Sequence, residues 1–522
     1  MAAELTTPHA PVTAAGNSVV HAAADHFSRQ PLCWRANAAG GLQVSPRADC
    51  WATPGAALDP QALFEYLYFH AIPAPRTVFK GVQRLRAGHE VRWDGQQARV
   101  GPWWRPSFAP VQSADFAALR VRFLSLLKDS VQRALGAGVP ACFLSGGTDS
   151  STVAGLLREV TGQAPQAYSI GFDSAGYDEM DYARLAARHF GVKHHEYYIT
   201  PDDLVRSIPV MAAAFDQPFG NSSVLPTYYC ALQARQGGAQ HLLAGDGGDE
   251  LFGGNARYAK QRVFGHYARI PAPLRRSVME PLFGLPVMAR VPLLKKGASY
   301  VEQARVPMPD RLQLTNLLHR LGPHQLLTAD FLAQVDPQGP AQHQRDTWAW
   351  AGGGAESEGA TSELNRMLAY DWQYTLADSD LPKVRSATAL AGVGVSFPLL
   401  DDALLEFSMG LPDDYKLKGP KLRWFFKEAL RGFLPDEIID KPKHGFGLPF
   451  GPWALKHAPL KRLAADSLHS LAGRGMVQPA FIRQLMDEHL PAHPGYYGEM
   501  VWVLMMLEQW LQAHAPKADF RG

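Results

Sequence analysis

A glycine-rich loop constrains this chain most, because it joins a predicted strand to a predicted helix: Ser145-Gly146-Gly147-Thr148-Asp149-Ser150. The apolar run from Val139 to Leu144 predicts a short buried strand, and the spacing of apolar residues predicts a helix over Ser151–Val160. A strand that stops at a glycine pair and restarts as a helix leaves backbone N–H groups unpaired at the positive end of the helix dipole. This arrangement predicts a seat for a phosphate or pyrophosphate.

The residues of the loop indicate which class of phosphate-binding loop it belongs to. It lacks the three spaced glycines of a dinucleotide fingerprint and the Gly-Lys-Ser/Thr ending of a Walker loop, and it carries Asp149 instead. A carboxylate in such a seat would repel phosphates unless Mg²⁺ lies between them. The loop therefore predicts a magnesium-bound polyphosphate. A glycine turn with a capping serine is the plainer alternative.

A second loop, Ala244–Gly254, places three acids within five residues and threads them with glycines. The acids are Asp246, Asp249 and Glu250. So many carboxylates in one packed loop are costly unless a cation or ligand compensates them. An acidic surface turn is the alternative for this loop alone.

The order of predicted elements indicates the fold class. Predicted strands at Gln166–Phe172, His194–Ile199 and Gln240–Ala244 alternate with predicted helices, the longest of which covers about Ala114 to Leu135. This alternation predicts an α/β fold with a doubly wound parallel sheet. Ligands bind such sheets at the carboxyl ends of the strands near the switch point, and both loops follow predicted strands.

The two loops together resemble those of the asparagine synthetase family, whose Ser-Gly-Gly-x-Asp-Ser motif belongs to the pyrophosphate-loop (PP-loop) ATP pyrophosphatases. The resemblance implies an adenine nucleotide α-hydrolase-like fold with a large helical C-terminal part, and ATP and Mg²⁺ as cofactors. It implies that Asp149 and Asp249 share the Mg²⁺. The residues implied to bind the nucleotide are Leu144, Ser145, Gly146, Gly147, Asp149, Ser150, Ile170, Ala244 and Gly245.

The same resemblance implies three catalytic residues. Asp246 stands where well-known members have a glutamate that acts as general base on the attacking amine. Lys383, three residues after Asp380, would face the phosphates. Lys443, on the proline- and glycine-rich loop Asp440–Pro449, would neutralise charge that develops in the transition state. Ordinary solvated lysines are the alternative for Lys383 and Lys443.

The N-terminal region resembles the tail of the family's glutaminase domain. A predicted helix from Pro60, a Pro-x-Pro-Arg-Thr turn and a predicted hairpin over 89–103 carry this likeness, whereas residues 1–55 show weak periodicity. The family's nucleophile is an N-terminal cysteine, but here Met1 is followed by Ala2, and neither Cys33 nor Cys50 could take that position without cleavage. We expect a truncated, inactive α+β domain over 1–110, a linker over 102–110, and a synthetase domain over 111–522.

The implied activity is amide synthesis through an acyl-adenylate, with release of AMP and pyrophosphate. Aspartate is the family's default substrate, although the stretch Gln217–Pro226 lacks the expected arginine. The amine would come from ammonia, from a separate glutaminase or from a substrate, and a substrate-carrier partner is compatible with this scheme. A β-lactam- or macrolactam-forming synthetase and a non-catalytic nucleotide-binding scaffold remain as alternatives. A tRNA-modifying pyrophosphatase is disfavoured because a thiolation cysteine pair and a basic stripe are missing.

The amino-acid composition limits which binding partners and which cellular compartment we expect for this chain. The chain has 51 Lys and Arg against 49 Asp and Glu, which gives no argument for nucleic acid through bulk charge. No apolar run of roughly 18 residues and no basic start with an apolar core is visible, so we expect no membrane partner and no export. Four widely spaced cysteines fit a reducing cytoplasm. The sequence does not indicate an oligomeric state.

Overall fold

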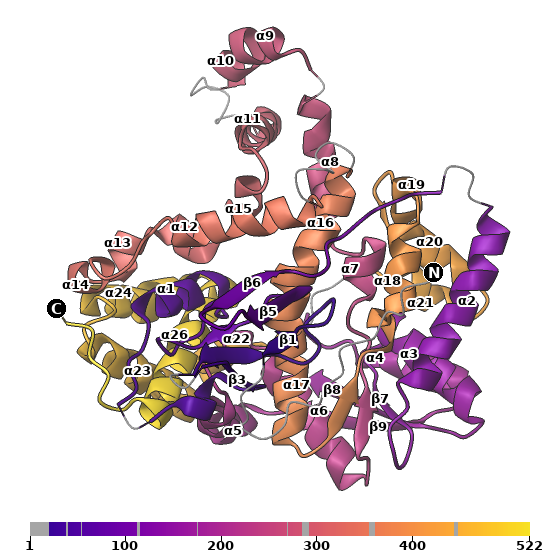
Figure 1. Cartoon of the computed structure of the whole chain (residues 1–522), viewed down its shortest axis with the longest axis horizontal. Coiled ribbons are helices and arrows are strands. Elements are labelled where there is room, and N and C mark those ends of the chain that lie inside the picture. Colours follow the sequence, from indigo (N-terminus) through magenta and orange to yellow (C-terminus); the bar gives the residue numbers. More distant parts are fainter. Residues whose placement is uncertain are drawn as a thin grey trace.

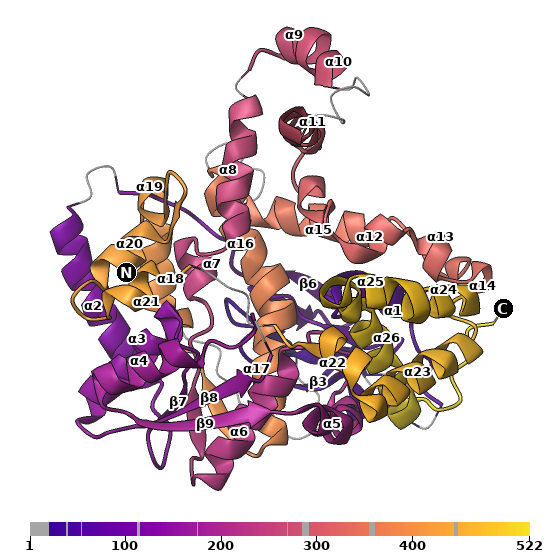
Figure 2. The ribbon, with the colours of Figure 1, turned by 180° about the vertical axis from the view of Figure 1, so that it is seen from behind.

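The computed structural model describes residues 20–521 except 38, 39, 54, 112–114, 175, 269, 284–291, 354–360 and 443–446. A five-stranded parallel sheet with helices lies beside a body of N-terminal strands and C-terminal helices (Figure 1). A helical arm projects from this assembly, and the view from behind shows the same projection (Figure 2). The predicted mixed α/β architecture with a parallel sheet is confirmed.

The elements have the following bounds. The strands are β1 His21–Ala23, β2 Cys33–Ala36, β3 Leu42–Ser45, β4 Gln83–Arg84, β5 His89–Trp93, β6 Ala98–Pro102, β7 Ala141–Phe143, β8 Gln166–Phe172, β9 Lys193–Ile199, β10 His241–Leu243, β11 Gly394–Ser396, β12 Leu417–Lys418 and β13 Lys421–Leu422. The helices up to the base of the arm are η1 Ala48–Trp51, α1 Pro60–Phe69, α2 Phe116–Arg133, α3 Thr148–Thr161, α4 Met180–Phe190, α5 Pro201–Ala214, α6 Val224–Gln236 and α7 Gly248–Phe252. The arm and the helices after it are α8 Ala256–Ala268, α9 Ala272–Leu274, η2 Arg275–Met279, α10 Glu280–Phe283, α11 Pro292–Arg305, η4 Asp310–Gln313, α12 Leu317–Leu321, α13 Pro323–Leu326, α14 Ala329–Leu332 and α15 Gly339–Ala351. The C-terminal helices are α16 Glu363–Asp371, η6 Trp372–Asp380, α17 Leu381–Leu390, η7 Pro398–Leu400, α18 Asp402–Met409, α19 Asp413–Lys416, α20 Trp424–Ala429, α21 Asp436–Asp440, α22 Phe450–Lys456, α23 Ala458–Gly473, α24 Pro479–Gln484, η8 Leu485–His489, α25 Leu490–Ala492 and α26 Pro494–His514.

The parallel sheet has the strand order β11-β10-β7-β8-β9. The chain runs outward from β7 through β8 to β9 and then returns to the other side of β7 as β10. The strand order therefore reverses between β7 and β10, and their carboxyl ends flank the crevice where ligands bind in such sheets. Asp149, in the first turn of α3, and Asp249, in the first turn of α7, follow these two strands.

Helices cover both faces of the sheet. Cys142 and Leu243 pack in a core with α2 and α3, whereas their chain neighbours Ala141 and Leu242 pack with α6 on the other face. This alternation is what strands buried on both sides produce. The predicted strand over Gln166–Phe172 has the observed bounds of β8. The other predicted strands of this region lie within about two residues of theirs, whereas helix α3 begins at Thr148, three residues before the predicted start at Ser151.

The N-terminal region forms two small antiparallel sheets, ordered β1-β5-β6 and β3-β2-β4. The predicted hairpin is confirmed, because His89 pairs with Pro102 and Trp93 pairs with Ala98. Strands β1, β2 and β3 form where the sequence has weak periodicity, so much of residues 20–55 is more regular than predicted.

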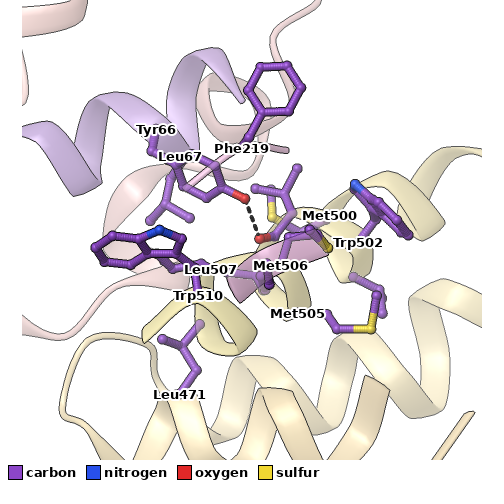
Figure 3. Close-up of a cluster of buried hydrophobic side chains, with 14 of the residues drawn as sticks. Tyr66, Leu67, Phe219, Leu471, Met500, Trp502, Met505, Met506, Leu507 and Trp510 are labelled. Carbon is purple, nitrogen blue, oxygen red and sulfur yellow. Dashed lines mark hydrogen bonds between the residues drawn. The ribbon is translucent and has the colours of Figure 1, made fainter. Parts of the chain in front are cut away.

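The N-terminal region packs tightly on the C-terminal helices. Helix α26 is buried on most sides, and Figure 3 shows Tyr66 and Leu67 of α1 against its apolar side chains. The hydroxyl of Tyr66 donates a 2.8 Å hydrogen bond to the carbonyl of Val503. A second connection is the ion pair of Arg84 with Asp378, at 2.6 Å and with both side chains 8% exposed.

The part of the chain that the structure describes contains no helix with both the length and the hydropathy needed to cross a bilayer.

We predict that Tyr66→Phe lowers the free energy of unfolding by about 1 kcal/mol, because it removes a buried hydrogen bond and little packing. Urea unfolding followed by circular dichroism measures the change. Tyr68→Phe on the same helix is the control, since that hydroxyl makes no hydrogen bond to another described residue. Equal midpoints for Tyr66→Phe and the wild type would show that this bond does not fasten α1 to α26.

Candidate active site

A cavity of about 490 Å³ opens at the switch point between β7 and β10. Its size is in the usual range for sites that bind small molecules. The candidate residues that line it are Leu144, Ser145, Gly147, Asp149, Ser150, Ile170, Gly245, Asp246, Asp249 and Lys383. Residues from four separate parts of the sequence therefore meet where the sheet topology predicts a ligand.

The phosphate loop has the geometry of an anion seat. Helix α3 begins at Thr148 with Gly147 as its N-cap and without a side-chain cap, so its first N–H groups remain available. The Ser145 backbone N–H donates to Ser150 Oγ at 3.1 Å, and the two Oγ atoms lie 3.0 Å apart. These bonds hold the loop closed around the end of the helix.

Two other candidate residues support the cavity without lining it. Gly146 has φ +73°, and a Cβ there would collide with the backbone of Ala183, so the loop can pass α4 only with glycine at this position. Ala244 is buried, and its N–H donates to the carbonyl of Ser396 at 2.9 Å, which extends the pairing of β10 with β11.

Asp149 and Asp249 converge on one cation, Arg423. Both oxygens of Asp149 lie 2.6 Å from Nη1 of Arg423, and Asp249 Oδ1 lies 2.9 Å from the same atom. Burial disfavours the guanidinium charge, but the two carboxylates outweigh this effect and raise the pKa of Arg423. Arg423 Nη2 also donates to Thr148 Oγ1. The sequence-based prediction that the two carboxylates reach one point agrees with this geometry.

This pair of carboxylates fits Mg²⁺. The described residues contain no group of three or more His, Cys, Asp or Glu that could hold a metal. Asp149 and Asp249 would give an ion two carboxylate ligands. Mg²⁺ commonly takes one or two carboxylates and completes its shell with substrate phosphates and water.

A second charged cluster surrounds Lys383. Its Nζ lies 2.9 Å from Asp380 Oδ1 and 3.7 Å from Asp246 Oδ1. Burial raises the pKa of Asp246 to about 6, and Lys383 opposes this rise only in part. Burial also disfavours the charge of Lys383, but Asp380 and Asp246 raise its pKa, so the amine stays protonated. The cluster therefore holds a carboxyl group that changes its charge near neutral pH.

Three basic residues at the cavity were absent from the sequence-based candidates: Arg423, Lys427 and Lys441. Lys427 makes no ion pair with an acid of the described chain, and burial followed by the charge of Arg423 lowers its pKa. Lys441 is paired with Glu179 at 3.0 Å. Arg423 is the N-cap of α20 and Lys427 lies four residues later in the last turn of this short helix, so their spacing was the available signal in the sequence. Lys443 lies outside the described residues, which stop at Pro442 and resume at Gly447.

We predict that Arg423→Leu lowers the free energy of unfolding by about 2 kcal/mol, because it leaves two close carboxylates without their cation. Added Mg²⁺ should restore part of this loss in the variant and change the wild type less. Urea unfolding with and without MgCl₂ measures both effects.

Arg133→Leu is the control for this measurement, since its ion pair with Asp401 lies at the surface and should contribute less than about 1 kcal/mol. A variant that Mg²⁺ does not stabilise would argue against a metal between Asp149 and Asp249.

Comparison with known proteins identifies the family. The asparagine synthase family model matches residues 122–512, and a glutamine amidotransferase domain model matches residues 13–104. The chain is 24% identical to asparagine synthetase [glutamine-hydrolyzing] 1 of Bacillus subtilis (strain 168), over 87% of this chain and 68% of that protein. It is 26% identical to a putative asparagine synthetase [glutamine-hydrolyzing] of Mycobacterium tuberculosis (strain ATCC 25618 / H37Rv), over 94% of this chain and 73% of that protein. Because the asparagine synthase family model matches more than half of the length of this chain, the chain belongs to the asparagine synthase family and is a carbon–nitrogen ligase.

Proposed function

We propose that this ligase uses ATP to adenylate a carboxylate, releases pyrophosphate, and transfers the acyl group to an amine. Aspartate and ammonia are the default substrates of this proposal. The observation that carries it is the convergence of Asp149 and Asp249 beside an uncapped helix N-terminus, in a cavity of nucleotide size. AMP is a good leaving group, so adenylation lets an amine displace oxygen at neutral pH.

In this proposal the phosphate loop grips the pyrophosphate half of ATP. The N–H groups at the start of α3 donate to phosphate oxygens, and Ser145 and Ser150 add hydroxyl donors. Backbone groups at Leu144, Ile170 and Gly245 hold the adenosine, whereas Ala244, which does not line the cavity, supports it through its pairing with Ser396. Mg²⁺ held by Asp149 and Asp249 would neutralise charge on the departing pyrophosphate.

The other charged residues of the site would accept the proton of the attacking amine and neutralise the negative charge that develops on the phosphates. Asp246 takes a proton from the attacking amine, and Lys383 faces the phosphates and orients Asp246 through their 3.7 Å ion pair. Lys427 and Lys441 reach the same cavity and would bind polyphosphate oxygens. Lys443 remains the proposed lysine that neutralises charge in the transition state.

We also infer that residues 111–522 are a PP-loop, adenine nucleotide α-hydrolase-like synthetase domain and that residues 1–110 are a truncated glutaminase-like domain. The strand order and the loops after β7 and β10 support the first inference. For the second, Cys33 is buried in β2, and burial raises the pKa of its thiol, which makes it a poor nucleophile. The relatives add no support for a lactam-forming enzyme, so ammonia is the first amine to test.

We predict that the protein with ATP, Mg²⁺, aspartate and ammonium releases AMP and pyrophosphate and forms asparagine. Asp149→Ala should reduce exchange of labelled pyrophosphate into ATP at least about 100-fold, because the polyphosphate loses a metal ligand. Asp181→Ala is the matched control, because this carboxylate is 94% exposed on α4.

If pyrophosphate exchange into ATP requires a carboxylic acid other than aspartate, that acid is the substrate, and the proposed adenylation chemistry still holds. Exchange by Asp149→Ala at the wild-type rate would contradict the metal assignment. Glutamine should not replace ammonium, and glutamate released from it would overturn the inference about the N-terminal region.

We predict that amide formation falls about tenfold per pH unit below pH 6, while pyrophosphate exchange does not. The pKa of Asp246 is raised to about 6, so the basic form is present above that pH and is lost as the pH falls through it. Rates must be compared at a constant concentration of free ammonia, because ammonium itself titrates.

Two variants separate this role from a structural one. Asp246→Asn should slow amide formation about 100-fold and remove the pH step, whereas Asp246→Glu should keep a base and a pH step. A pH step that survives in Asp246→Asn would assign the proton transfer to another group.

A further inference from the structure

A helical arm formed by α8, α9, η2, α10 and α11 projects from the body in both views, and its tip consists of α9, η2 and α10 (Figures 1 and 2). The arm is attached at its base, where Tyr258 is buried and Arg257 pairs with Asp371. Helices α8 and α11 share a small core that includes Phe264 and Val301. The arm is therefore a packed unit that holds its tip away from the body.

The arm concentrates positive charge. Residues 256–305 contain ten Lys and Arg against two Glu, a net charge of +8, whereas the whole chain has +2. The net charge of the whole chain therefore does not show that basic residues are concentrated in this segment. Lys260, Arg276 and Lys296 are exposed and have no acid within ion-pair distance in the described part of the chain. These cations are available to an external anionic surface.

The tip also exposes apolar side chains. Leu274 is 48% exposed and Leu282 is 44% exposed, and Pro281 beside Leu282 is exposed as well. Residues 272–283 form one continuous helical stretch, in which positions i, i+7 and i+8 share a face. Val263 on α8 is 52% exposed. Basic side chains beside an uncovered apolar helix face are typical of segments that lie in a membrane interface.

We propose that the tip of the arm docks on an anionic lipid surface. Leu274 and Leu282 enter the boundary between headgroups and acyl chains, and Arg276 and Lys296 contact the headgroups. A nucleic acid would use the positive charge but would leave the leucine face uncovered, because single strands stack on aromatic rings and duplexes bind polar side chains. A lipid surface satisfies both features at once.

The fold allows this docking to coexist with catalysis. The cavity lies at the edge of the parallel sheet, and the arm extends away from the sheet in both views (Figures 1 and 2). A flat surface that touches α9 and α10 can therefore leave the cavity open. Docking of this kind would hold the ligase next to a substrate at the lipid surface without changing the chemistry of its site.

The test is sedimentation of the full chain with vesicles of phosphatidylcholine alone or of equimolar phosphatidylcholine and phosphatidylglycerol. We expect binding to the second kind only, and weakening as salt screens the charges. Arg276→Glu with Lys296→Glu should weaken binding by more than roughly tenfold, because each basic side chain near an anionic surface contributes roughly a factor of five. Leu274→Ser with Leu282→Ser should weaken it by a similar factor.

Val121→Ser is the matched control, since Val121 is 71% exposed on α2 outside the arm and should leave vesicle binding unchanged. Thermal unfolding shows that each variant is folded. No binding to the anionic vesicles at low salt overturns the proposal, and so does equal binding to both kinds. The proposal also fails if the leucine variant disrupts a dimer in gel filtration without affecting vesicle binding, or if the same residues bind an oligonucleotide in preference to vesicles.

Discussion

The site depends on a single electrostatic constraint, which is that two carboxylates from different strands must share one cation. Asp149 follows β7 and Asp249 follows β10, and Arg423 Nη1 lies within 2.9 Å of both. The return of the chain across β7 makes these strands neighbours, so their following loops meet. Arg423 reaches this point from the segment before α20 and keeps the carboxylates close when no metal or nucleotide is present.

The N-terminal region is tied to the same site through one continuous helical segment. Asp378 in η6 pairs with Arg84 of β4, and five residues later Lys383 in α17 reaches the cavity beside Asp246. The Arg84–Asp378 ion pair and the Lys383–Asp246 ion pair both depend on the position of this helical segment between the N-terminal region and the cavity. In the proposed function, an inactive N-terminal region would still contribute to catalysis, because its packing fixes the helix that carries Lys383.

Patterns local in the sequence predicted the fold well, and interactions between distant residues were the ones missed. The strand β8 and the loops after β7 and β10 follow from runs of apolar residues and glycines. Strand β11 was not predicted, because three residues give no period and its pairing with β10 comes from the fold. The role of Arg423 was not predicted, because it depends on Asp149 and Asp249 lying close together in the folded chain. Charge counted over the whole chain likewise concealed the basic arm.

The charge of the cavity explains why a polyphosphate needs a metal there. Among the described residues the cavity is lined by more acids than bases, namely Asp149, Glu179, Asp246, Asp249, Glu250 and Asp380 against Lys383, Arg423, Lys427 and Lys441. Burial raises the pKa of Glu250 well above its usual value, which favours its neutral form, and the other acids of the lining still outnumber the bases by five to four. A triphosphate would be repelled by such a lining. In the proposed function, a divalent cation held by Asp149 and Asp249 would add positive charge beside the phosphate loop, so that the loop and the carboxylate pair would act together on a polyphosphate.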